Sequence, residues 1–289
     1  MQLAVNILVL ASIYALIACG YVLVYRVSRV LNLAHGELMM LGAYALFATA
    51  SSFPGHPFAA VAAAALLALA VGGLVYWLLM RRMTGEAVLA AVLATIGLGI
   101  LLRGAMVLAW GPQERHPLQA LGMSNASFAI GDARISSVGL LLFTATASVY
   151  LGLYAFLRYT AWGVRMRAAG QNPLLAAQRG IRLHAVYALA WGLSTFTAGL
   201  AGMLIASESA LDQTMVVIGL KAFPAALVGG LDSLAGALVG ALIVGAAEVL
   251  SIHYIDPLLA EVVPFLVLLA MLIVRPWGLF GAREELDRV

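Results

Sequence analysis

Residues 3–25, LAVNILVLASIYALIACGYVLVY, form one long apolar run near the start of the chain. A helix that crosses the hydrocarbon core of a bilayer needs about 20 mostly apolar residues, and this run has that length. It is too long for the core of a signal peptide, and Met1 and Gln2 provide no basic region before it. The run therefore predicts an uncleaved first transmembrane helix.

The composition of the whole chain is typical of a membrane protein. Of 289 residues, 64% are hydrophobic and only 10% are charged, and the mean hydropathy is +1.02. A soluble domain carries about 25% charged residues, so an ordinary soluble enzyme is excluded. A formal net charge of +3 is too small to indicate nucleic-acid binding. The single cysteine, Cys19, excludes a disulfide framework within the chain and a cysteine-based zinc site.

Apolar segments along the whole chain predict an all-α, polytopic transmembrane helical bundle. The segments lie at about 4–25, 30–50, 58–80, 87–109, 138–157, 186–206 and 258–274. Region 221–252 is too long for one span, and Gly229, Gly230 and Asp232 interrupt it. We predict a short helix, a turn and a full helix from about residue 234. The result is a single domain, 1–289, with about 8–9 crossings and one broken or re-entrant segment. No internal repeat is evident between 30–50 and 221–252.

The arginines predict the orientation of the bundle, because loops on the cytoplasmic side carry the Lys and Arg excess. Placing 26–29, 81–86, 158–185 and 275–289 inside collects twelve of the sixteen basic residues. They are Arg26, Arg29, Arg81, Arg82, Arg158, Arg165, Arg167, Arg179, Arg182, Arg275, Arg283 and Arg288. This distribution predicts an N-terminus outside and a C-terminus inside.

The loop from Arg158 to His184, RYTAWGVRMRAAGQNPLLAAQRGIRLH, carries five arginines and no acid. Its centre has the signals of a short helix: Asn172 as the N-cap, Pro173 at the first position and Gly180 as a left-handed stop. Such a helix is about 10 Å long and does not span a membrane. Two interpretations remain open from the spacing alone. Either the helix is a rigid knob presented to a cytoplasmic partner, or its arginines hold the loop against anionic lipid.

Polar residues also interrupt the second apolar segment, at Asn32-Leu33-Ala34-His35-Gly36-Glu37. Ionisable groups at membrane depth are costly and usually face a cavity or a partner. Gly36 weakens the helix and is a candidate for a break. One interpretation is a gate or pathway lining, a role that Gly229, Gly230 and Asp232 would share. The other places His35 and Glu37 at the inner interface, bonded to neighbouring loops. The spacing does not match a His-Glu-x-x-His metal motif, so we predict no metal site.

Four further charged residues fall inside or near the apolar segments. Arg103 and Glu248 are expected at similar depth, and Glu208 and Lys221 near the outer surface, so each pair is a predicted ion pair. The chain has no G-x-x-x-x-G-K-[ST] loop for nucleotide phosphates and no complete nucleophile elbow. Active transport would therefore draw its energy from an ion gradient or from another subunit.

The stretch Asn32 to Tyr44, NLAHGELMMLGAY, closely resembles the signature N-F-A-H-G-E-x-x-M-x-G-A-Y of LivH-type permeases, the membrane subunits of branched-chain amino acid ABC transporters. Three more stretches resemble the same family in the same order. They are Ala168–Pro173 through Gly180–Ile181, Gly219–Phe223 through Val228–Ala237, and Arg275–Gly281. Leu175 stands where the general coupling pattern of ABC permeases has an acid. Asp232 stands where the family more often has glycine, and we expect its side chain to cap the turn.

The resemblance implies a permease subunit in a bacterial inner membrane, and no enzyme. Its implied partners are a LivM-like second permease, two cytoplasmic ATPases and a periplasmic binding protein. No cofactor is implied in this chain, since ATP and Mg²⁺ belong to the ATPases. The short helix in the loop at about 158–185 would be the coupling helix that docks on an ATPase. Its implied coupling residues are Asn172, Pro173, Leu174, Ala176, Ala177, Arg179, Gly180 and Ile181.

Two other classes of function remain as alternatives. A stand-alone secondary transporter or channel would work without ATP, and an intramembrane enzyme would depend on a single Ser or His. The substrate is open as well, because LivH-like permeases serve importers of branched-chain and other amino acids, urea, short amides and aromatic acids.

Overall fold

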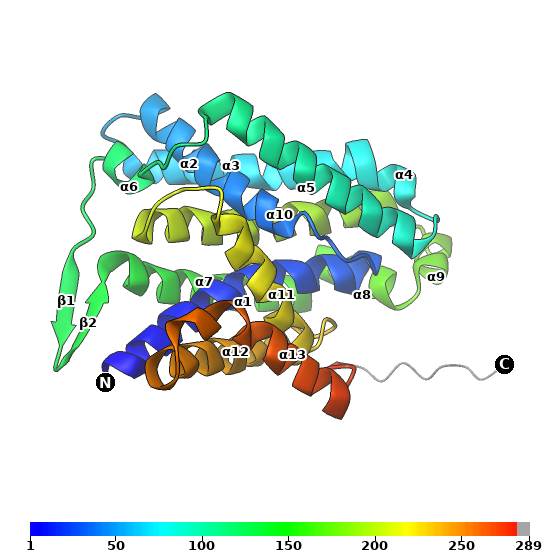
Figure 1. Ribbon diagram of the computed structural model, residues 1–289. Helices are drawn as coiled ribbons and strands as arrows, with labels where there is room; N and C mark the ends of the chain where they lie inside the picture. Colours follow the sequence, from blue (N-terminus) through cyan, green and yellow to red (C-terminus); the bar gives the residue numbers. More distant parts are fainter. Residues whose placement is uncertain (282–289) are drawn as a thin grey trace.

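The first helix, α1 (Gln2–Ser28), runs through the middle of a bundle of roughly aligned helices (Figure 1). The computed structural model describes residues 1–281, and Arg283 and Arg288 lie outside the described residues. In the apolar 18-residue segment of α1, 72% of the residues are buried. In the corresponding segments of α5 (Val88–Trp110) and α7 (Ser137–Tyr159), only 22% are buried. The first apolar run of the sequence is thus the core of the fold, and the outer helices expose their apolar faces.

The remaining elements follow in chain order. They are α2 (His35–Ser52), α3 (Pro57–Val75) continued by a π turn (Tyr76–Met80) and α4 (Arg81–Met83), α6 (Pro117–Ala120), strands β1 (Ser127–Ile130) and β2 (Ala133–Ser136), α8 (Ala161–Gln171), α9 (Pro173–Gln178), α10 (Leu183–Glu208), α11 (Met215–Gly229), α12 (Leu234–Tyr254), a 3₁₀ turn (Pro257–Glu261) and α13 (Val263–Val274). Among the described residues, six helices are long and apolar enough to cross a membrane, and α11 and α13 are shorter apolar helices. The all-α prediction is confirmed apart from one small hairpin.

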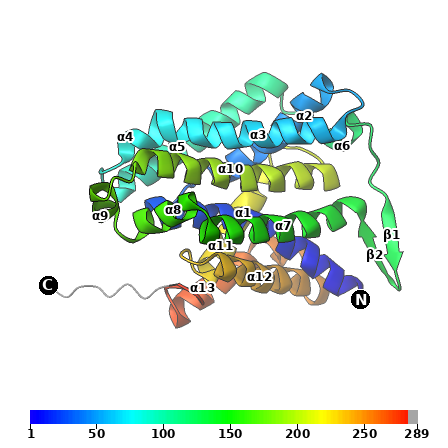
Figure 2. The same cartoon turned by 180° about the vertical axis from the view of Figure 1, so that it is seen from behind.

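The bundle has two chemically different ends (Figures 1 and 2). The N-terminus and the β1–β2 hairpin lie at one end, and α4 and α9 lie at the other. We call them the hairpin end and the arginine end. The arginine end carries the basic residues at the end of α1, on α4, at the end of α7 and on the segment from α8 to the start of α10. Most of the arginines that the sequence assigned to one side of a membrane, among the described residues, therefore gather at one end of the molecule.

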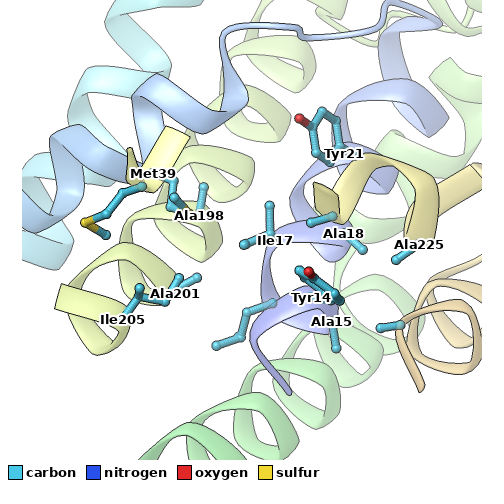
Figure 3. Close-up of a cluster of buried hydrophobic side chains, with 14 of the residues drawn as sticks. Tyr14, Ala15, Ile17, Ala18, Tyr21, Met39, Ala198, Ala201, Ile205 and Ala225 are labelled. Atoms are coloured by element: carbon cyan, nitrogen blue, oxygen red, sulfur yellow. The ribbon is translucent and has the colours of Figure 1, made fainter. Parts of the chain in front are cut away.

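The core forms where small residues let helices approach α1. Ala15 and Ala18 of α1 are fully buried, and Figure 3 shows the α1 side chains between Met39, Ala198 and Ala201 on one side and Ala225 on the other. These neighbours come from α2, α10 and α11. Large side chains such as Tyr14, Ile17 and Tyr21 fill the remaining space in the same cluster. Dispersion contacts of this kind hold helices together in lipid, where burial of apolar surface gives little advantage.

Two sets of four helices pack in the same pattern. The first set is α1, α2, α3 and α5, and the second is α10, α11, α12 and α13. In the first set, α2 packs on α3 and α5, and also on α10 of the second set. In the second set, α11 packs on α12 and α13, and also on α1 of the first set. Likewise, α3 lies against α10, and α12 lies against α1. The sets run in opposite directions, because α1 begins at the hairpin end and α10 begins near α9 at the arginine end. The fold is therefore an inverted repeat, which the sequence did not reveal.

The predicted boundaries hold for most segments and fail at five places. The break in 221–252 is confirmed, since α11 ends at Gly229 and α12 begins at Leu234. However, α11 begins earlier, at Met215, and α2 begins later than predicted, at His35. Residues 258–274 contain a 3₁₀ turn before α13, and the hairpin and α8 were not predicted. Polar capping residues fix two of these boundaries, because Thr160 caps α8 and Asp256 caps the 3₁₀ turn.

The contact between α2 and α10 requires glycine at position 202. A Cβ there would lie 2.0 Å from the carbonyl oxygen of Met39. We expect Gly202→Ala to lower the free energy of unfolding by about 1–3 kcal/mol, the usual cost of overpacking a core. The midpoint of thermal unfolding in detergent measures the loss. Gly97→Ala is the matched control, because a Cβ on Gly97 meets nothing within 4 Å. Equal stability of both variants would contradict the close helix contact.

Candidate functional site

The α2 helix begins inside the bundle, after an irregular stretch formed by residues 29–34. Asn32 is buried, and its Oδ1 accepts a hydrogen bond from the Ala34 amide at 3.1 Å. The Leu33 amide donates to Thr95 Oγ1 on α5, also at 3.1 Å. Side chains therefore satisfy backbone groups where the helical ladder is missing. Asn32 Nδ2 has no hydrogen-bond partner among the described residues.

His35 fixes the start of α2 to the middle of α1. The side chain is fully buried, and its Nε2 lies 3.1 Å from the carbonyl oxygen of Ile17. Its ring centroid lies 4.3 Å from that of Tyr21. A Cβ on Gly20 would come within 2.4 Å of the imidazole, so this glycine leaves the room that His35 occupies. In this conformation His35 is a packed contact, and its Nδ1 has no hydrogen-bond partner among the described residues.

Gly36 is the point where α2 crosses α11. A Cβ on Gly219 would lie 2.5 Å from the Cα of Gly36, and a Cβ on Gly36 would lie 2.9 Å from the carbonyl oxygen of Val216. The expectation of a break at Gly36 is wrong, because the helix is interrupted before His35 and continues through Gly36. Position 36 requires a glycine because the backbones of α2 and α11 are in contact there.

Glu37 and Arg103 place charges on the same side of this crossing. Glu37 is half-buried against α5, and a Cβ on Gly99 would lie 3.1 Å from its carboxylate. One turn further along α5, the exposed Arg103 donates from Nη2 to the Gln213 carbonyl oxygen at 3.2 Å. Since exposed charges are costly against lipid, this side of α2 and α5 is the best candidate for a surface that faces water or a partner.

The start of α11 is also preceded by an irregular stretch, residues 209–214. Arg115 and Leu211 exchange two backbone hydrogen bonds, at 3.0 and 2.8 Å. Asp212 Oδ1 accepts from the amides of Thr214 and Met215, at 2.9 and 3.2 Å, and so provides acceptors for backbone donors where the helix begins. The two irregular stretches thus precede the two helices that cross at Gly36 and Gly219.

The second predicted break, at Gly229 to Asp232, lies at the arginine end. Gly230 adopts a φ of 101°, which favours glycine, and Arg29 Nη1 donates to Asp232 Oδ1 at 2.8 Å. The expectation that Asp232 caps the turn is wrong, because Ser233 Oγ accepts the Gly236 amide at 3.0 Å and caps α12. Arg29 is twelve residues beyond Ile17, roughly 18 Å along α1. The structure therefore does not bring Asp232 together with His35, and the predicted gate residues form two separate groups.

The segment after α13 covers the turn at Gly229. The amides of Leu279 and Phe280 donate to the carbonyl oxygens of Val228 and Gly229, at 2.9 and 3.0 Å. A Cβ on Gly278 would lie 2.4 Å from the Leu227 carbonyl oxygen. The motif Arg275–Gly281 therefore packs on the break between α11 and α12 and forms hydrogen bonds with its backbone.

The predicted short helix in the arginine-rich loop is present as α9. Asn172 Oδ1 accepts from the Leu175 amide at 3.0 Å, Pro173 is the first residue, and Gly180 has a φ of 80°. Ala176 is buried against the rest of the protein, while Leu174 and Leu175 are 70% and 57% exposed. The remaining predicted coupling residues, Ala177, Arg179 and Ile181, follow on the same turn and its stop. The helix therefore presents an apolar surface at the arginine end.

A family model described as a branched-chain amino acid transport system permease component matches residues 3–272. The chain is 31% identical to the high-affinity branched-chain amino acid transport system permease protein LivH of Salmonella typhimurium, over 100% of this chain and 97% of LivH. It is 30% identical to BraD of Pseudomonas aeruginosa, over 100% of this chain and 98% of BraD. It is 28% identical to a probable branched-chain amino acid transport permease protein LivH of Methanocaldococcus jannaschii, over 95% of this chain and 90% of that protein.

The chain belongs to the branched-chain amino acid permease family. It is a multi-pass membrane permease, in agreement with the six helices of spanning length. Among its described residues, no group of three or more His, Cys, Asp or Glu side chains is placed to hold a metal ion.

The permease pairs its membrane-buried charges differently from the sequence expectation. Lys221 Nζ of α11 lies 2.7 Å from Glu248 Oε1 of α12, and the Tyr14 hydroxyl of α1 donates to Glu248 Oε2 at 2.5 Å. The predicted pair of Arg103 with Glu248 is therefore wrong. So is the predicted pair of Glu208 with Lys221, because Glu208 accepts from Asn125 and Ser136 at the hairpin end. Lys221 lies deeper than expected because α11 begins inside the bundle.

Removing one partner of the Lys221–Glu248 pair leaves a buried charge without compensation. Their side chains are only 12% and 4% exposed. We expect Lys221→Met to destabilise the permease by about 3–5 kcal/mol, and the double variant Lys221→Met/Glu248→Gln to recover most of that loss. Thermal unfolding in detergent measures both effects.

Arg103→Gln is the control for the buried pair, because Arg103 is exposed and its hydrogen bond goes to a backbone carbonyl. We expect this variant to lower the free energy of unfolding by less than about 1 kcal/mol. If the double variant were as unstable as Lys221→Met, the two charges would not compensate each other.

Proposed function

We propose that this permease is a membrane-spanning subunit of an ABC importer. It forms half of the translocation pathway for branched-chain amino acids or a similar small solute that a periplasmic binding protein delivers. The observation that carries the proposal is α9, a capped helix too short to span a membrane, with two exposed leucines at the arginine end of the bundle. The matches over 97% of LivH and 98% of BraD support the same role.

The proposed orientation places the arginine end in the cytoplasm and the hairpin end in the periplasm of a bacterium, with the protein in the inner membrane. Positively charged residues remain preferentially on the cytoplasmic side of a membrane, and the arginine end carries more of them than the hairpin end does. About nine crossings are consistent with this orientation when α2 and α11, each preceded by an irregular stretch, count as one crossing each. The N-terminus is then outside and the C-terminus inside.

The coupling helix α9 is fixed to the permease in a way that transmits movement. Ala176 is buried, and its carbonyl oxygen accepts the Ile181 amide at 3.1 Å. Through Ile181 and Arg182 the chain continues directly into α10, which packs against both α1 and α2. A displacement of α9 by an ATPase therefore reaches the start of α2. The switch between two states of the pathway requires ligands that bind them with different affinity.

The proposed assembly contains a LivM-like second permease, two cytoplasmic ATPases and the binding protein. ATP and Mg²⁺ would bind to the ATPases and not to this chain. Glu37 and Arg103 lie on the side of α2 and α5 that we assign to the pathway or to the second permease, together with Gly36 and the buried Asn32 side chain.

The competing function is a stand-alone secondary transporter or channel. Purified chain in liposomes distinguishes the two functions. Solute uptake by this chain alone would contradict the importer assignment, whereas uptake that requires ATPases and ATP would support it. Co-purification with ATP-binding subunits gives the same answer without a known substrate.

The exposed face of α9 provides the direct test of coupling. We expect Leu174→Asp and Arg179→Glu each to reduce co-purification of the ATPases by roughly tenfold or more, because both change a docking surface while leaving the buried Ala176 in place. Arg82→Glu is the matched control, since Arg82 is an exposed arginine on α4 at the same end. Loss of ATPases in the control as well would indicate a general charge effect and contradict docking on α9.

A further inference from the structure

A partly open cavity of about 360 Å³ lies at the arginine end, outside the proposed pathway. Its walls come from the end of α1, the end of α7, the middle of α8 and the start of α12. Three arginines from three helices line it, namely Arg26, Arg158 and Arg167. The turn before α12 closes it with Asp232 and Ser233.

The cavity carries an excess of positive charge. Arg26 is repelled by Arg167 and attracted by Asp232, and within residues 1–281 neither arginine makes a hydrogen bond or ion pair to an acid. The acid in the wall, Asp232, is already bonded to Arg29 at 2.8 Å. Arg158 donates to the Tyr154 hydroxyl and lies over the Tyr154 ring, 5.6 Å from its centroid. Three guanidinium groups thus share one cavity with a single carboxylate, which another arginine already engages.

The start of α12 lines the same cavity. Leu234 and Ala235 are the first residues of this 21-residue helix, and both line the cavity. Amides in the first turn of a helix have no acceptor within the helix and attract anions. The Ser233 hydroxyl oxygen accepts a hydrogen bond from the Gly236 amide at 3.0 Å. The chemistry of the cavity therefore fits a phosphate, which accepts several charged and backbone hydrogen bonds together.

The surroundings of the cavity indicate where the phosphate comes from. Tyr154 and Tyr159 are 52% and 74% exposed beside it, and Leu151 one turn further along α7 is 69% exposed. Exposed aromatic residues at the end of an apolar helix face are typical of the membrane interface. In the proposed orientation this is the cytoplasmic leaflet, where anionic headgroups lie. Leu157 and Tyr154 provide an apolar wall next to the arginines.

We propose that this cavity binds the phosphate of an anionic phospholipid headgroup, whose acyl chains lie along α7. The arginines of α1, α7 and α8 surround the phosphate, and the first amides of α12 face it. The bound lipid joins α8, which leads into α9, to α1 and α12. The lipid is therefore a structural ligand that holds the coupling segment to the core of the permease.

The test compares lipid binding by wild-type permease and the double variant Arg26→Gln/Arg167→Gln. Native mass spectrometry of the full chain in detergent, titrated with dioleoyl phosphatidylglycerol, measures the bound fraction. We expect the double variant to bind roughly 30-fold more weakly, which corresponds to about 1 kcal/mol for each arginine near an anionic group. Dioleoyl phosphatidylcholine, which carries no net charge, should bind to neither protein.

Three further measurements distinguish a lipid site from diffuse charge attraction, from a folding defect and from a site for a soluble anion. Arg82→Gln removes an exposed arginine at the same end but outside the cavity, and should bind phosphatidylglycerol as wild type does. Arg26→Lys/Arg167→Lys keeps the charge and should retain most of the binding, which shows that the cavity is folded. Inorganic phosphate at millimolar concentration should not displace the lipid.

The proposal is overturned if Arg82→Gln weakens lipid binding as much as the double variant, because the attraction would then be diffuse. Displacement of the lipid by inorganic phosphate would instead indicate a site for a soluble anion. Loss of ATPase co-purification with unchanged lipid binding in the double variant would assign the arginines to a protein contact. Lipid binding is read without ATP or solute, so its outcome is independent of the proposed importer function.

Discussion

Every backbone amide and carbonyl at membrane depth needs a partner within the protein, and the fold depends on how this requirement is met at two irregular stretches. Residues 29–34 and 209–214 interrupt the helical ladder before α2 and α11. The first uses Asn32 and Thr95 as substitute partners, and the second uses Asp212 and the backbone of Arg115. Neither stretch is stable when exposed to lipid. Both must be enclosed by other helices.

The need to enclose these stretches explains why α1 and α10 lie at the centre. Each contacts the interrupted helix of the opposite set, α1 with α11 and α10 with α2. Small residues let these helices approach closely enough to bury backbone. Gly20 leaves space for His35, Gly202 lies against Met39, and Gly36 meets Gly219. The inverted repeat therefore uses the same arrangement twice: each irregular stretch precedes a helix that packs on the central helix of the opposite set.

The sequence predicted features that depend on local signals. The break at Gly229 to Leu234 and the helix from Asn172 to Gly180 were found because glycine, proline and capping residues act over a few positions. Features that depend on distant contacts were missed. Lys221 meets Glu248 only because α11 begins inside the bundle, and the role of Gly36 depends on Gly219. The inverted repeat has no signal in residue identity, since packing in lipid requires small size rather than a particular residue.

In the importer that we propose, the same constraint would explain how a soluble subunit moves the membrane pathway. Irregular backbone inside a bilayer is held by a few side-chain hydrogen bonds, so a small shift of a neighbouring helix changes their geometry more than it changes a regular ladder. α10 is this neighbour, because it begins directly after α9 and packs along α2. The Ser194 hydroxyl of α10 also donates to the Gly20 carbonyl oxygen at 2.8 Å, beside His35. In the proposed importer, movement of α9 would therefore be transmitted first to the place where α2 begins, and the regular outer helices would not need to deform.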